Sequence, residues 1–172
     1  MGLPRSLLLM AASLCACAPT LDWRLVKPAQ LGLEALFPCR PAALTRDVPL
    51  LKERLAMVVH ACSAGGSTFA VGSMVLGDVR DVSAAIDALR DAAARNLGAT
   101  IGECRPVDVP NMTPNSRAGR CLLKGHRPDG SAVVEHVLVF ARGARVYQAS
   151  VLGDAADDAT ATTFFNGLKV TS

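Results

Sequence analysis

The residues of this sequence best able to do chemistry are six cysteines and three histidines. A cysteine can be acylated, bind a metal, attack a substrate or form a disulfide, and its spacing indicates which role applies. No CxxC pair is present, which argues against a zinc site and against a redox-active disulfide. Cys15 and Cys17 follow an apolar run near the start, whereas four more cysteines are spread along the chain at Cys39, Cys62, Cys104 and Cys121.

The start of the chain has the three parts of a secretory signal. A short basic segment ends at Arg5, an uncharged apolar run follows, and small residues precede a break. The uncharged run covers only residues 6–20, whereas a membrane-spanning helix needs about 20 apolar residues, so we do not expect a transmembrane anchor. The end of the run, Leu14-Cys15-Ala16-Cys17, resembles the lipobox of bacterial lipoproteins.

This resemblance implies that residues 1–16 are removed as a signal peptide. Cys17 then becomes the lipidated N-terminus, and residues 17–30 form a tether to the domain. Stable anchoring needs more than one acyl chain, and bacterial lipoproteins carry several. Because residue 18 is Ala and not Asp, the resemblance also implies the periplasmic face of the outer membrane. The alternative is an ordinary signal peptide, whose removal leaves Cys17 as a free thiol.

The rest of the chain has the size of one domain, which we place at residues 31–172. Removing 16 of 172 residues leaves 156. The removed segment contains Arg5, so 17 basic and 15 acidic side chains are left, a balance that does not indicate nucleic-acid binding. An exported chain enters an oxidising compartment, where disulfides are expected.

The hydrophobic pattern predicts two blocks of strands and a final short strand. The first block comprises residues 31–37, 43–48, 54–62 and 68–76, which we expect to form one antiparallel meander. The second block comprises residues 100–107, 117–125, 131–141 and 145–152, and the final strand covers residues 168–170.

Two helices are predicted between and after these blocks. An apolar stripe indicates a helix over residues 82–97, with Asp81 or Ser83 as its cap and Gly98 at its end. The second helix is expected to start with Asp154 as its cap. The order ββββ-α-ββββ-α-(β) predicts an α+β fold in which two helices cover an antiparallel β-sheet.

The strand assignments also predict how the four remaining cysteines pair. Cys104 and Cys121 are equidistant from the middle of the loop that joins their strands, so they should lie opposite each other in a symmetric hairpin. Cys39 and Cys62 are then the second pair. We interpret both disulfides as structural, each worth roughly 3 kcal/mol in the chain-entropy model.

Three segments resemble PsbP-like α/β/α domains. They are Leu36–Pro41 after the first strand, residues 133–148 in a late hairpin, and "FFNGLKV" at residues 164–170. The resemblance extends over residues 31–170 and implies an α/β/α sandwich with a non-catalytic accessory or protein-binding role. The chain is also similar to small proteobacterial lipoproteins, and that likeness implies no chemistry.

Few other residues point to catalysis or metal binding. His60 and His136 lie in the middle of predicted strands, but Glu135 points to the opposite face from His136, so we interpret both histidines as polar, solvent-facing positions. The aspartates within residues 154–158 lie at a helix start, where negative charge is favourable, and we expect capping rather than calcium binding. No nucleophile-elbow, zinc-protease or phosphate-loop motif is present.

The sequence therefore favours a non-catalytic accessory or protein-binding module of the cell envelope, held in the membrane by acyl chains on Cys17. We expect an envelope protein as partner, and no cofactor, metal or nucleic acid. A carrier of small molecules or lipids is the first alternative, and it requires a pocket between helix and sheet. An enzyme is the second, and it requires polar groups that converge in a cleft from His60, His136, Arg142 or Arg145. Trp23 is expected to pack on the domain, or else to contact the membrane or a partner.

Overall fold

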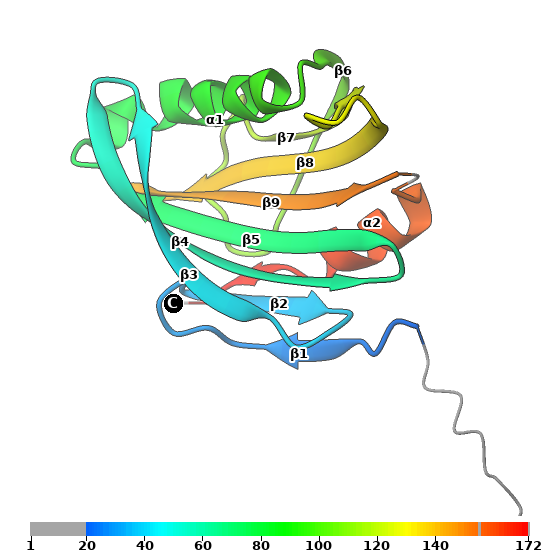
Figure 1. The fold of residues 1–172 in the computed structure, drawn as a ribbon. Coiled ribbons are helices and arrows are strands. Elements are labelled where there is room, and N and C mark those ends of the chain that lie inside the picture. The colour runs from blue at the N-terminus through cyan, green and yellow to red at the C-terminus, as the bar shows by residue number, and fades with distance from the viewer. Residues whose placement is uncertain (1–19, 155, 172) are drawn as a thin grey trace, which may run out of the picture.

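The computed structural model describes residues 20–154 and 156–171. Its main element is a seven-stranded antiparallel sheet with the strand order β3-β4-β5-β9-β8-β7-β6 (Figure 1). The strands are β3 (Ala42–Leu50), β4 (Glu53–Ala64), β5 (Ser67–Val75), β6 (Thr100–Pro106), β7 (Gly119–His126), β8 (Ala132–Arg142) and β9 (Arg145–Gly153). The predicted signal peptide and lipobox, Cys17 included, lie outside the described residues.

A second, three-stranded antiparallel sheet has the order β1-β2-β10 and comprises β1 (Arg24–Val26), β2 (Leu33–Phe37) and β10 (Lys169–Val170). The predicted four-stranded meander is therefore wrong, because its first strand belongs to this small sheet. Pro38 and Pro41 interrupt the chain after β2 and prevent a tight hairpin with β3. Part of the segment expected to be a tether, Arg24–Val26, forms β1 and pairs with β2.

Two helices flank the large sheet: α1 (Val82–Asn96), preceded by a 3₁₀ turn η1 (Val79–Asp81), and α2 (Asp158–Asn166). Asp81 is at the N-cap of α1, although its side chain makes no capping hydrogen bond. The predicted cap of the second helix is wrong. Asp157 caps α2 by accepting a hydrogen bond from the backbone N–H of Thr160 at 2.9 Å, while Asp154 pairs with Arg127 instead.

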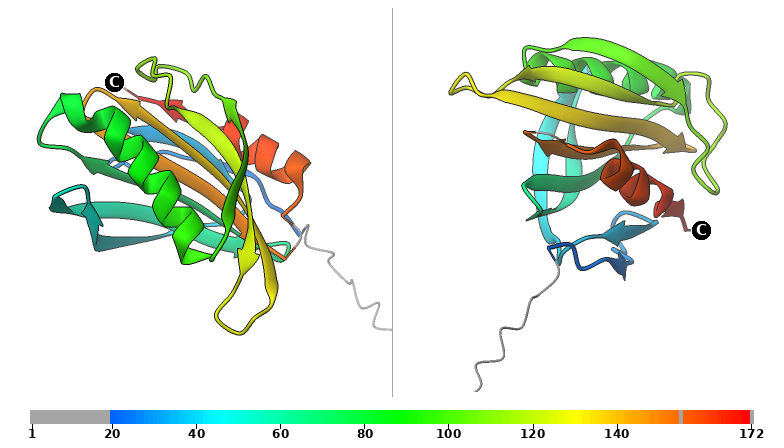
Figure 2. Two further views of the ribbon diagram at one scale, coloured as in Figure 1. Left: turned by 90° about the horizontal axis from the view of Figure 1, so that it is seen from above. Right: turned by 90° about the vertical axis from the view of Figure 1, so that its right-hand side faces the viewer.

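The large sheet separates two hydrophobic cores. Helix α1 lies on one face of the sheet and α2 on the other (Figure 2). One core lies between the sheet and α1, and the other lies between the sheet, α2 and the small sheet. Side chains alternate along a strand, so β8 contributes to both: Val137 and Val139 face α1, whereas Leu138 and Phe140 face α2. The predicted α+β class, an antiparallel sheet with two helices, is confirmed.

Two disulfide bonds are present, Cys39–Cys62 and Cys104–Cys121, and these are the pairs that the sequence predicts. The second pair joins register partners on β6 and β7. The first joins the segment after β2 to β4, and therefore ties the small sheet to the large one. Among the described residues, no helix combines the length and apolar character of a membrane span.

Candidate functional site

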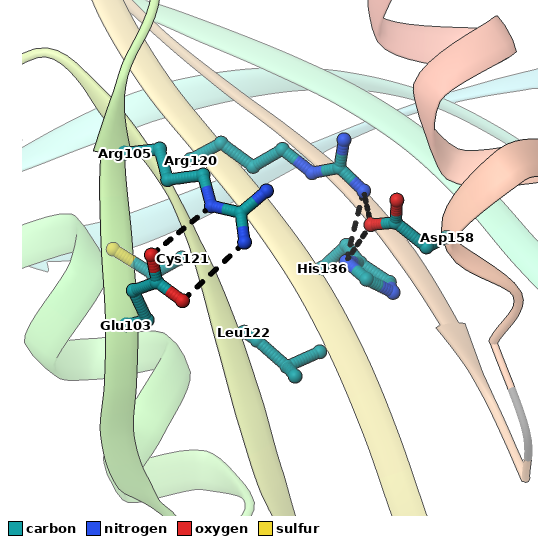
Figure 3. Close-up of a pocket in the computed structure, with 7 residues that line it drawn as sticks. All are labelled: Glu103, Arg105, Arg120, Cys121, Leu122, His136 and Asp158. Carbon is teal, nitrogen blue, oxygen red and sulfur yellow. Dashed lines mark hydrogen bonds and ion pairs between the residues drawn. The ribbon is translucent and has the colours of Figure 1, made fainter.

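The first candidate is a polar network between the large sheet and α2, drawn in Figure 3. His136 on β8 is 5% exposed and lies beside Arg120 of the neighbouring strand β7. Arg120 donates through Nη2 to His136 Nδ1 at 3.0 Å and to Asp158 Oδ1 at 2.7 Å. An arginine only donates, so His136 Nδ1 accepts, and its Nε2–H donates to the carbonyl of Ala156 at 3.0 Å.

These contacts attach α2 to the large sheet. Arg120 also donates to Thr162 Oγ1 at 2.8 Å and lies 5.0 Å from the centre of the Phe165 ring. Burial lowers the pKa of His136, which therefore stays neutral to a lower pH than a free histidine. The adjoining cavity is about 100 Å³, below the range of small-molecule sites, which starts at about 300 Å³.

The second candidate is a groove on the opposite face of the sheet, beside α1. It has a volume of about 590 Å³, within the usual range for small-molecule sites. It exists because α1 lies mainly over β8 and β9 and leaves much of the same face of β5, β4 and β3 without a helix on it (Figure 2). The β3–β4 hairpin bends towards the start of α1, so the uncovered face is concave (Figure 1).

Small and flexible side chains form the floor of the groove. The small side chains of Ala61 and Ala70 form one end of the floor, and Met57 lies over Gly72 at the other end. A Cβ at position 72 would collide with the Met57 side chain, so the glycine allows Met57 to lie flat in the floor. Methionine has three rotatable bonds and a polarisable sulfur, and it adapts readily to ligands of different shape.

The wall of the groove is formed by one side of α1. Leu89, Ala92, Ala93 and Asn96 recur at helical spacing and line it. Polar groups are few: Thr68, Gln148 and Ser150 project from β5 and β9, and Arg46 on β3 and Asn96 on α1 complete the polar lining. A mostly apolar surface with a few polar groups is typical of sites for small ligands.

Glu135 adjoins this groove from β8. It is 8% exposed and lies between Leu123 and Leu152 of the flanking strands. Burial raises the pKa of the Glu135 carboxyl to about 7, and the nearby Ser150 hydroxyl acts in the opposite direction. Because Leu152 and Ser150 line the groove, a carboxyl that is uncharged below about pH 7 lies next to its inner end.

The sequence-based interpretation of the two strand histidines is wrong, because both are buried. His136 is covered by α2. His60 on β4 is 9% exposed, and among the described residues its Nε2 has no hydrogen-bond partner. Burial lowers the pKa of His60. His60 and Val58 share a face that packs against the α2-side core, which the alternating pattern of β4 could not reveal.

The residues that an enzyme was expected to use make separate contacts. Arg142 donates to the carbonyl of Asn111 at 2.7 Å, and Arg145 donates to that of Gln30 at 3.1 Å. Both hold loops against the sheet. Within the described part of the chain, no group of three His, Cys, Asp or Glu side chains lies close enough to hold a metal.

The aspartates of residues 154–158 also contact different partners. Asp154 pairs with Arg127, Asp157 caps α2, and Asp158 pairs with Arg120. Trp23 packs on the domain as expected, with its ring 6.0 Å from that of Phe69 in an edge-to-face arrangement.

The comparisons with known proteins give no family. No protein-family model matches this chain, and no curated protein matches it. A crystal structure of a protein from Bacteroides thetaiotaomicron VPI-5482 is similar to it, with a TM-score of 0.43 and 10% identity over 81% of this chain. The match covers 45% of that protein, so this chain spans less than half of its length.

Proposed function

We propose that this protein is an exported, lipid-anchored accessory protein of the bacterial envelope, and that its domain binds a small apolar or amphipathic ligand without catalysis. The observation that carries the binding role is the open groove of about 590 Å³ beside α1. Its apolar floor and wall fit a ligand that is driven from water by the hydrophobic effect.

The envelope location rests on the sequence and on the disulfides. Leu14-Cys15-Ala16-Cys17 resembles a lipobox, and the domain contains Cys39–Cys62 and Cys104–Cys121, bridges that persist in an oxidising compartment. The layered arrangement of helix, sheet and helix supports the resemblance to PsbP-like α/β/α domains, and with it an accessory role.

The intact mass of the protein purified from membranes tests the location. We expect a chain that starts at Cys17 and carries added acyl groups, and a gain of four hydrogens when the two disulfides are reduced. A Cys17→Ser variant should lose the acyl groups. An unacylated wild-type chain would contradict the proposed anchor.

Photo-cross-linking tests the binding role. The acylated full chain in phosphatidylcholine vesicles is irradiated with a fatty alcohol that carries a diazirine in its tail, and the labelled peptides are identified. We expect label in β4 and α1. Ala92→Trp fills the groove and should reduce this label, whereas Asp91→Trp, on the outward side of the same helix, should not. Equal labelling of both variants would contradict binding in the groove.

A further inference from the structure

One charged side chain lines the groove within the described part of the chain. Arg46 lies on β3, directly opposite Met57 in the register, at the rim of the groove. Because β3 is an edge strand of the large sheet, the guanidinium at this rim is accessible from solvent. No carboxylate is among the described residues that line the groove.

Arg46 also differs from most arginines of this protein in having no bound partner. Seven other arginines of the described chain form ion pairs. Arg54, Arg142 and Arg145 donate hydrogen bonds to backbone carbonyls. Arg46 makes neither kind of contact with any described residue, so its guanidinium is available to a ligand in the groove.

We infer that the groove binds a single-chain amphiphile with an anionic head group, such as a fatty acid, whose carboxylate contacts Arg46 while its tail lies along the floor. This inference rests on the proposed binding function and specifies its ligand. The guanidinium fork matches a carboxylate in a bidentate, charge-assisted arrangement.

The dimensions of the groove fit one flexible tail. Its floor runs from Met57 to Ala61 along β4, which is about 13 Å at the usual rise of a strand. Across the sheet it extends over four neighbouring strands, β3, β4, β5 and β9, or about 14 Å. The adaptable Met57 lies at the end where Arg46 stands, so the first part of the tail would pass over it.

The position of Leu21 points to a membrane as the source of this ligand. Leu21 contacts the β4–β5 turn at Gly65, and this turn is at one end of the strands that form the groove floor. Only three peptide units separate Cys17 from Thr20, so a lipid on Cys17 would hold this end of the domain within about 10 Å of the bilayer. Fatty acids dissolved in that bilayer would then lie close to the groove.

Two photoactive probes with the same diazirine-bearing tail test the inference, one a fatty acid and the other a fatty alcohol. Both are added to the acylated full chain in phosphatidylcholine vesicles, at a pH at which the acid is ionised. We expect Arg46→Ala to reduce labelling of β4 and α1 by the acid about tenfold and to leave labelling by the alcohol unchanged. Arg46→Lys keeps the positive charge but not the planar fork, so it should retain only part of the acid label.

Arg54→Ala is the matched control, since it removes the same charge from the same hairpin. Arg54 is exposed and lies on the opposite face of β4 from Met57, so neither probe should be affected. Intact mass confirms that every variant keeps both disulfides.

The outcomes distinguish a failure of head-group recognition by Arg46 from a failure of the binding function. Acid labelling that is unchanged in Arg46→Ala would overturn the role of Arg46, while alcohol labelling that is still blocked by Ala92→Trp would uphold the binding function. Equal loss of acid and alcohol labelling in Arg46→Ala would also overturn head-group recognition. If neither probe labels β4 or α1 in the wild type, the inference and the binding function both fail.

Discussion

Replacing Glu135 by Gln should remove a large part of the pH dependence of this protein's stability. In the folded state burial raises the pKa of Glu135 to about 7, whereas its ordinary value is 4.5. The folded chain therefore binds this proton more tightly than the unfolded chain, and the free energy of unfolding falls as the pH rises from 4.5 to about 7. The difference between the two pKa values corresponds to about 3 kcal/mol, all of it lost above about pH 7.

The assay is equilibrium unfolding in urea of wild type and Glu135→Gln across this pH range, with the disulfides intact. The amide is uncharged at every pH and has nearly the shape of the protonated acid. His60, His136 and all other titrating groups are common to both proteins, so their effects cancel in the difference. We expect a difference near zero below pH 4.5, and a variant more stable by about 3 kcal/mol above about pH 7. A difference that is constant with pH, or that favours wild type at high pH, would refute a buried, uncharged Glu135.

Four further changes test the rest of the structure. His60→Phe should stabilise the protein by about 1 kcal/mol at neutral pH, because it removes a buried and unpartnered Nε2. This gain should grow as the pH falls below 6.5, because the lowered pKa of His60 makes the folded wild type less stable relative to its unfolded chain at those pH values. Replacing Cys104 and Cys121 by Ala should lower the free energy of unfolding by about 3 kcal/mol in urea, and an unchanged midpoint would contradict a structural disulfide. Arg120→Ala should cost about 2 kcal/mol in thermal unfolding because it leaves the buried ring of His136 without its donor. Asp158→Ala removes one partner of an exposed ion pair and should cost less than about 1 kcal/mol. A larger loss of stability in Asp158→Ala than in Arg120→Ala would contradict the proposed attachment of α2 through Arg120.

The local elements could be predicted from the sequence because their signals are local. Residues 82–97 carry one apolar stripe, and α1 covers almost the same range. The disulfide Cys104–Cys121 follows from the symmetry of a single hairpin. The sheet to which residues 31–37 belong could not be predicted. The partners of β2 are β1 and the distant β10, and the alternating side-chain pattern of β2 does not identify its partner strands.

The candidate sites depend on long-range packing, which explains why the sequence did not reveal them. The pattern of β4 correctly places Leu55, Met57, Val59 and Ala61 on one face. An apolar face of this kind ordinarily indicates a buried one, and the groove exists only because α1 lies over β8 and β9 instead. His136 is buried for the same kind of reason, since Arg120 and α2 reach it from other parts of the chain.

The proposal with the widest consequences for this protein is that the groove beside α1 holds an anionic amphiphile. The native mass spectrum of the protein purified from membranes tests it most directly, recorded for wild type and for Ala92→Trp. We predict a wild-type species heavier than the acylated chain by the mass of one such molecule, and its absence in the groove-filling variant. Identical spectra for the two proteins, with or without added mass, would contradict the claim.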